Sequence, residues 1–159
     1  MSRLVVLDTS PLGMVTNPKD SSESRECKEW LKGLLEAGVQ VAIPAIADYE
    51  LRRELLRERK IKGIERLDAL SQRVGYLDIR GTTLEVAAEL WAEARIAGIP
   101  TAHDKAIDGD MILTAQARMV IEGGFDAVIA TSNVSHLARF GFAKLWQDIG
   151  TNPLEPLER

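Results

Sequence analysis

The sequence predicts a three-layer α/β/α fold built on a mostly parallel central sheet. Strands and helical segments alternate along the 159 residues, and the two clearest strands, 4–7 and 127–130, are apolar without interruption. A strand with one face in water alternates apolar and polar residues, whereas a strand covered on both faces is apolar throughout. Alternating strands and helices are typical of a parallel sheet covered by helices on both sides.

Five strands are expected, and they are separated by helices. The strands fall at 4–7, 39–43, 76–79, 127–130 and 143–146. Apolar spacing, capping residues and glycine stops predict helices from the capping box at 20–23 to Gly38, then over 45–60, 64–73, 82–98 and 108–121. Residues 1–150 therefore form one domain, and 151–159 an irregular tail.

Three details of these helices can be checked directly. Asp20 is the expected cap of the first helix, and Gly63 the expected break between the second and third. Residues 99–107 are expected to form a loop. The inward face of the 82–98 helix is expected to carry Leu84, Ala88, Trp91 and Ala94, and all three tryptophans, Trp30, Trp91 and Trp146, are expected in the core.

Composition narrows the chemistry that a site could use. Cys27 is the single cysteine, which excludes an intrachain disulfide and a cysteine-rich zinc site, and two histidines are too few for a histidine cage. Carboxylates would have to hold any metal, and they favour Mg2+ or Mn2+. No apolar stretch reaches eighteen residues and the first apolar run is not a signal peptide, so a cytoplasmic protein without a membrane span is expected.

Two polar residues lie just beyond the ends of the clearest strands. Asp8 ends the first strand and Asn133 follows the strand at 127–130. In parallel sheets a ligand site lies beyond the carboxyl ends of the strands, so both are candidate site residues. Asp8 could equally be the cap of the following turn, and Asn133 a turn residue.

Two further acids lie on predicted helices. Asp110 shares a helix face with Leu113, which aligns it with the buried side, whereas Asp108 two residues earlier is expected to be the cap or a water-mediated helper. Glu50 lies at an apolar border of the 45–60 helix. Taken alone, it could be a solvated charge paired with Arg53 or Arg57.

In this order, the acids resemble the motifs of PIN-domain nucleases. The resemblance covers nearly the whole chain and rests on four segments, Leu7-Asp8-Thr9-Ser10, residues 47–54 around Glu50-Leu51-Arg52, residues 110–117, and residues 128–133. It is closest to the small single-domain prokaryotic members, many of which are toxins of the VapC type. These are typically homodimers held inactive by an antitoxin protein.

The resemblance implies an endoribonuclease that uses Mg2+ or Mn2+ to hydrolyse RNA phosphodiester bonds. Asp8, Glu50 and Asp110 match its metal-binding acidic triad, and Asn133 matches a fourth catalytic position that is often Asp in this family. Asn133 supplies a neutral oxygen in place of a charge. This counts against a second strongly bound metal, although not against the first. Supporting positions are Thr9, Asp108 and Thr131.

RNA would need positive charge near these acids, although the net charge of the chain is −4. The only basic run follows Glu50, and Arg52, Arg53 and Arg57 are its candidate RNA contacts. The same run could instead be a solvated face balanced by glutamates. A catalytically silent PIN-like domain that binds RNA or a protein partner is the alternative function. Phosphate-binding loops and serine-hydrolase elbows are absent from the sequence.

Overall fold

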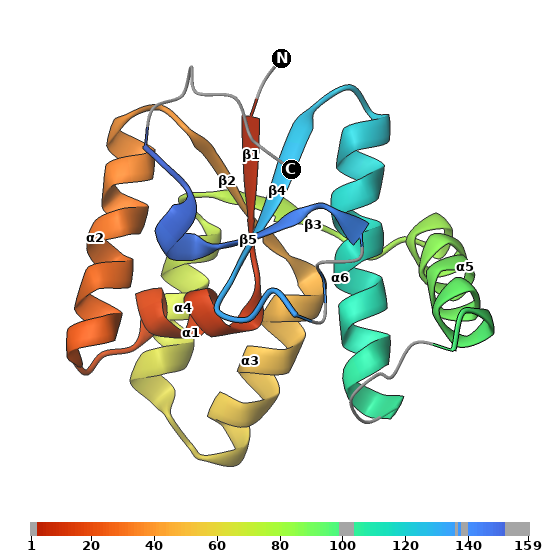
Figure 1. The fold of residues 1–159 in the computed structure, drawn as a ribbon. Helices are drawn as coiled ribbons and strands as arrows, with labels where there is room; N and C mark the ends of the chain where they lie inside the picture. The colour runs from red at the N-terminus through yellow and green to blue at the C-terminus, as the bar shows by residue number, and fades with distance from the viewer. Residues whose placement is uncertain (1–2, 99–103, 136, 138–139, 152–159) are drawn as a thin grey trace.

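The computed structural model describes residues 3–98, 104–135, 137 and 140–151, and it contains a five-stranded, wholly parallel sheet (Figure 1). The strands lie in the order β3-β2-β1-β4-β5. Their bounds are β1 Arg3–Leu7, β2 Gln40–Pro44, β3 Gly75–Leu77, β4 Asp126–Thr131 and β5 Ala143–Leu145. All five expected strands are present, and the predicted fold class is confirmed.

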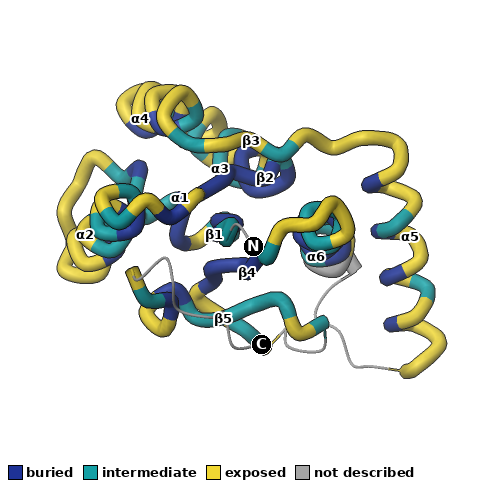
Figure 2. The backbone as a smooth tube through the Cα atoms, turned by 90° about the horizontal axis from the view of Figure 1, so that it is seen from above, coloured by how far each residue is buried: buried dark blue, intermediate teal, exposed yellow. Residues whose placement is uncertain are grey.

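Helices cover both faces of this sheet. Their bounds are α1 Thr9–Thr16, α2 Ser22–Glu36, α3 Ala45–Arg57, α4 Ile61–Ser71, α5 Gly81–Ile96 and α6 Asp104–Glu122, with a short 3-10 helix η2 at Trp146–Asp148. Val5 and Leu7 of β1 pack in a core with residues of α1 to α4, while Val6 packs on the other face with residues of α6. Figure 2 shows α5 outside α6, so α6 separates it from the sheet.

The first helix of the structure was not predicted. Helix α1 begins one residue after β1, with Asp8 as its cap. The predicted cap of the next helix was also wrong, because Ser21 caps α2 by accepting a hydrogen bond from the Ser24 N–H at 3.1 Å. Asp20 instead forms a salt bridge with Lys28 at 2.6 Å.

Gly63 does not break the helices. The turn between α3 and α4 lies at Arg59, whose φ of 54° is in the left-handed region. Gly63 lies inside α4, where an added Cβ would come within 2.9 Å of Leu55 Cδ2. The missing side chain therefore lets α3 and α4 pack closely, and the sequence alone could not separate this role from that of a break.

The predicted inward face of α5 was wrong except for Ala94. Thr83, Ala87, Leu90 and Ala94 are the buried residues, whereas Leu84 and Trp91 are 50% and 40% exposed. Because α5 packs mainly on α6, it buries only a narrow stripe. Trp91 is therefore not a core residue, unlike Trp146, which is 3% exposed, and the partly buried Trp30 that packs against it.

Helix α6 begins at Asp104, so the predicted loop at 99–107 is helical from residue 104 and lies outside the described residues at 99–103. Of the predicted tail, only residue 151 is described. None of the helices in the described ranges is both long and apolar enough to cross a membrane.

Candidate active site

The carboxyl ends of β1 and β4 form the base of the candidate site. The two strands pair in parallel, and the Asp8 N–H donates to the Ala130 carbonyl at 2.9 Å. Asp8 Oδ1 accepts from the Thr9 N–H at 2.7 Å, and Asp8 Oδ2 accepts from Thr131 Oγ1 at 2.8 Å. The cap interpretation of Asp8 is thus confirmed, and the buried Thr131 hydroxyl fixes the second carboxylate oxygen.

Asn133 uses its side chain in a turn. Its Oδ1 accepts from the Ser135 N–H at 3.0 Å and from Ser135 Oγ at 2.6 Å, and the residue is exposed. Its own N–H donates to Thr131 Oγ1 at 3.2 Å, which connects the turn to the hydroxyl that holds Asp8. These bonds are those of a turn residue, the alternative that the sequence had left open.

Glu50 reaches the same region from α3. Its carboxylate lies against the backbone of α6, since a Cβ built on Gly109 would be 3.0 Å from Glu50 Oε1. Partial burial raises the pKa of Glu50, and the charges of Asp8 and Asp110 raise it further, while Arg53 lowers it. Glu50, on α3, is therefore close enough to Asp8 after β1 and to Asp110 on α6 for both charges to disfavour its ionised form.

Asp110 and Asp108 lie on different sides of α6. Asp110 is partly buried and Asp108 is exposed. Because α6 begins at Asp104, Asp108 cannot be its cap, and that part of the prediction was wrong. The orientation that the spacing predicted, with Asp110 directed inward rather than Asp108, agrees with the burial and with the influence of Asp110 on Glu50.

The carboxylates are not arranged as a complete set of metal ligands in the described residues. Among the described residues, no three acidic, histidine or cysteine side chains already stand where they could hold a metal ion together. Thr9 Oγ1, beside Asp8, is buried and has no hydrogen-bond partner within the described part of the chain. Buried hydroxyls usually have a hydrogen-bond partner, so Thr9 is an exception directly beside Asp8.

In the basic run after Glu50, Arg52 and Arg57 already form ion pairs with neighbouring acids. Arg52 Nε donates to Asp48 at 2.8 Å, and a second guanidinium nitrogen donates to Asp68 at 2.7 Å. Arg57 pairs with Glu54 and Glu58 on the exposed face of α3. Arg53 differs, because its guanidinium lies 5.2 Å from the ring centroid of the exposed Tyr49 and its charge acts on Glu50.

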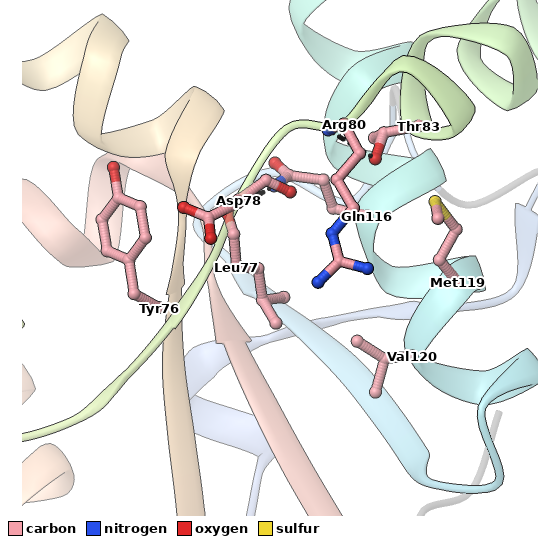
Figure 3. A pocket seen from close by; sticks show the side chains of 8 residues that line it. All are labelled: Tyr76, Leu77, Asp78, Arg80, Thr83, Gln116, Met119 and Val120. Atoms are coloured by element: carbon pink, nitrogen blue, oxygen red, sulfur yellow. Dashed lines mark hydrogen bonds between the residues drawn. The ribbon is translucent and has the colours of Figure 1, made fainter.

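A separate pocket of about 250 Å³ opens between β3, α5 and α6 (Figure 3). Gln116 forms part of its wall and donates to the Leu77 carbonyl at 2.7 Å, while Arg80 extends over it. Its lining contains none of the predicted site residues.

Sequence reasoning missed two features near the acids. Ser10, in the first turn of α1, and Ser132, directly after β4, share a hydrogen bond of 2.8 Å, which no local pattern could reveal. The role of Gly109 was also missed, because a helix predicted to begin at residue 108 places it in the first turn; inside α6, a glycine costs about 1 kcal/mol relative to alanine. Such a cost suggests a tertiary reason for keeping the glycine.

The fold has a clear counterpart among solved structures. The chain is similar to a chain in the crystal structure of VapBC2 from Rickettsia felis bound to a DNA fragment from their promoter, with a TM-score of 0.66. The match covers 90% of this chain and 98% of that chain at 20% identity, which shows a PIN-like fold. No protein-family model and no curated protein sequence matches the chain.

Proposed function

We propose that this chain is a divalent-metal-dependent endoribonuclease that hydrolyses RNA phosphodiester bonds. The observation that carries the proposal is that the charges of Asp8, after β1, and Asp110, on α6, both act on the Glu50 carboxylate of α3. Repulsion between partly buried carboxylates costs stability unless a cation neutralises them. In this proposal the three carboxylates hold Mg2+ or Mn2+.

The donor chemistry fits such a cation. Carboxylate oxygens are the ligands that Mg2+ and Mn2+ prefer, and each Asp8 oxygen keeps a free lone pair after accepting one hydrogen bond. Asn133 stays in its turn and adds no charge, which favours one firmly bound cation over two.

Each residue then has a defined task. Asp8 is the fixed ligand, because Thr131 and the start of α1 orient its carboxylate, and Asp110 and Glu50 complete the set. When bound, the cation supplies Lewis-acid polarisation of a phosphate and lowers the pKa of water. Arg53 is the residue that meets the RNA backbone, since Arg52 and Arg57 are already paired.

The similarity to a VapBC2 chain supports a partner for this enzyme. We propose that the chain is the toxin of a toxin–antitoxin pair, acts on RNA in the cytoplasm as a homodimer, and is restrained by an antitoxin protein. Co-expression with a short neighbouring gene product, followed by co-purification, tests the partner. Light scattering of the chain alone tests the dimer.

A catalytically silent domain is the competing function, and the unfinished ligand set in the described residues favours it. Mn2+ binding by calorimetry and cleavage of labelled RNA separate the two. We expect binding, cleavage that EDTA stops, and loss of both in Asp110→Asn. Glu122→Gln is the matched control, because it neutralises an exposed acid at the far end of the same helix and should retain most activity. A wild-type chain that neither binds Mn2+ nor cleaves RNA would establish the silent domain.

A further inference from the structure

Gly109 lies in the interior of α6, directly before Asp110. No turn or positive φ explains a glycine there, because the helix continues on both sides and the positive-φ glycines of the described chain lie elsewhere. Glycine is among the poorest helix formers. The reason for it must therefore be sought in what packs against it.

The space beside Gly109 is filled by the Glu50 carboxylate. A Cβ at position 109 would meet Glu50 Oε1 at 3.0 Å, and Cδ and Oε2 at 3.4 Å each. All three atoms of one carboxylate thus lie where a side chain on α6 would begin. At the helical glycines Gly13 and Gly63 an added Cβ would meet a leucine, whereas at Gly109 it would meet a carboxylate.

We propose that Gly109 is a positioning residue that lets the Glu50 carboxylate lie against α6, within reach of the charges of Asp8 and Asp110. This inference rests on the proposed function. A side chain at 109 would push the carboxylate away by a few tenths of an ångström or more, because it is the flexible end of a long side chain. Metal–ligand distances tolerate only about 0.2 Å, so such a displacement weakens cation binding.

Gly109→Ala should lower the affinity for Mn2+ without lowering the stability of the metal-free protein. Alanine improves the helix, so the metal-free variant should unfold at an equal or higher urea concentration than wild type. Its Mn2+ affinity should nevertheless fall by about 10- to 100-fold, the usual effect of losing a residue that orients a ligand. A purely structural role would not separate the two measurements in this way.

Gly13→Ala is the matched control. Gly13 also lies inside a helix, and its added Cβ would make an ordinary contact of 3.5 Å with Leu51 Cδ1. This variant should keep wild-type Mn2+ affinity. Gly109→Leu, with a larger and equally helix-compatible side chain, should lose more affinity than Gly109→Ala.

A double-mutant cycle tests whether Gly109 acts through Glu50. Glu50→Asp shortens the side chain by one methylene and so withdraws the carboxylate from α6. Adding Gly109→Ala in that background should change Mn2+ affinity by less than twofold. Such non-additivity of the two substitutions would show that Gly109 acts through Glu50. Calorimetry with Mn2+ alone measures all four proteins, and urea unfolding in EDTA accompanies each.

The outcomes are distinct. Wild type that binds no Mn2+ overturns the proposed function. Wild type that binds while Gly109→Ala binds equally well overturns only the role of Gly109. A lower urea midpoint for Gly109→Ala also overturns it, because the backbone would then have yielded instead of the carboxylate.

Discussion

Asp8 and Glu50 reach the candidate site in contrasting ways. Asp8 follows a central strand, and hydrogen bonds from Thr9 and Thr131 fix both of its carboxylate oxygens. Glu50 extends from α3, accepts no hydrogen bond from the described residues, and is placed by Gly109 and by the charges around it. One carboxylate is held by the sheet, and the other can move, so their substitution should have different consequences.

The fixed carboxylate gives the largest expected effect. Asp8→Asn preserves the cap of α1, because asparagine caps helices as well as aspartate does. Losing an oriented ligand should reduce Mn2+ affinity and RNA cleavage by more than about 100-fold, since loss of supporting residues alone costs 10- to 100-fold. Calorimetry and a cleavage assay measure this, with Asp20→Asn as the control. Intact binding in Asp8→Asn would leave Asp8 as a cap only.

The hydroxyl behind Asp8 gives the next effect. Thr131→Val keeps the buried volume and removes the bond to Asp8 Oδ2 as well as the acceptor for the Asn133 N–H. We expect Mn2+ affinity to fall by about 10- to 100-fold. Thr131→Ser, which keeps the hydroxyl, should restore most of it. Equal affinity in the valine and serine variants would show that Asp8 needs no help to stay oriented.

The Glu50 carboxylate should make the free energy of unfolding depend on pH. The pKa of Glu50 is raised in the folded protein, so folding binds a proton that unfolding releases. The protonated form therefore stabilises the fold at low pH, and this stabilisation is lost as the pH rises above 4.5 through the raised pKa.

Glu50→Gln removes that dependence. In EDTA the variant should unfold at higher urea than wild type near neutral pH, and the difference should vanish as the pH falls toward 4.5, the ordinary pKa of glutamate. Saturating Mn2+ should reverse the order, because only wild type gains from binding. Glu54→Gln on the exposed face of α3 is the control. A pH-independent difference would contradict repulsion as the cause.

The smallest effect concerns RNA. Arg53→Gln should weaken RNA binding by at most about fivefold, the range for one exposed charge. It should also reduce the salt dependence of binding by about one phosphate contact, a slope of roughly 0.7 for a single strand. Arg57→Gln, whose charge is already paired with Glu54, should change neither. Fluorescence anisotropy over a salt series, on an uncleavable RNA, measures both variants. If Arg53→Gln and wild type showed the same salt dependence of RNA binding, Arg53 would not contact the RNA backbone.

The strands were predictable because a strand covered on both faces has an apolar signature of its own. The helix faces were less so. Leu84 and Trp91 look like core residues in the sequence, yet α5 lies outside α6 and buries a different stripe. Likewise, Gly63 looks like a break but supports packing on Leu55. Local patterns indicate where a helix forms and leave open which neighbour it meets.

The sequence by itself determined the parallel α/β architecture and the order of four short acidic and polar motifs. Both depend on short-range patterns, because an apolar run marks a buried strand and the polar residues after it mark its end. Only the tertiary structure decided that Thr131 holds Asp8, that Asn133 serves its own turn, and that Glu50 lies on Gly109. These contacts join residues up to 123 positions apart, and the pleat and helix crossing that create them have no local signature. The carboxylates were visible in the sequence, and the fold determined which of them is held and which can move.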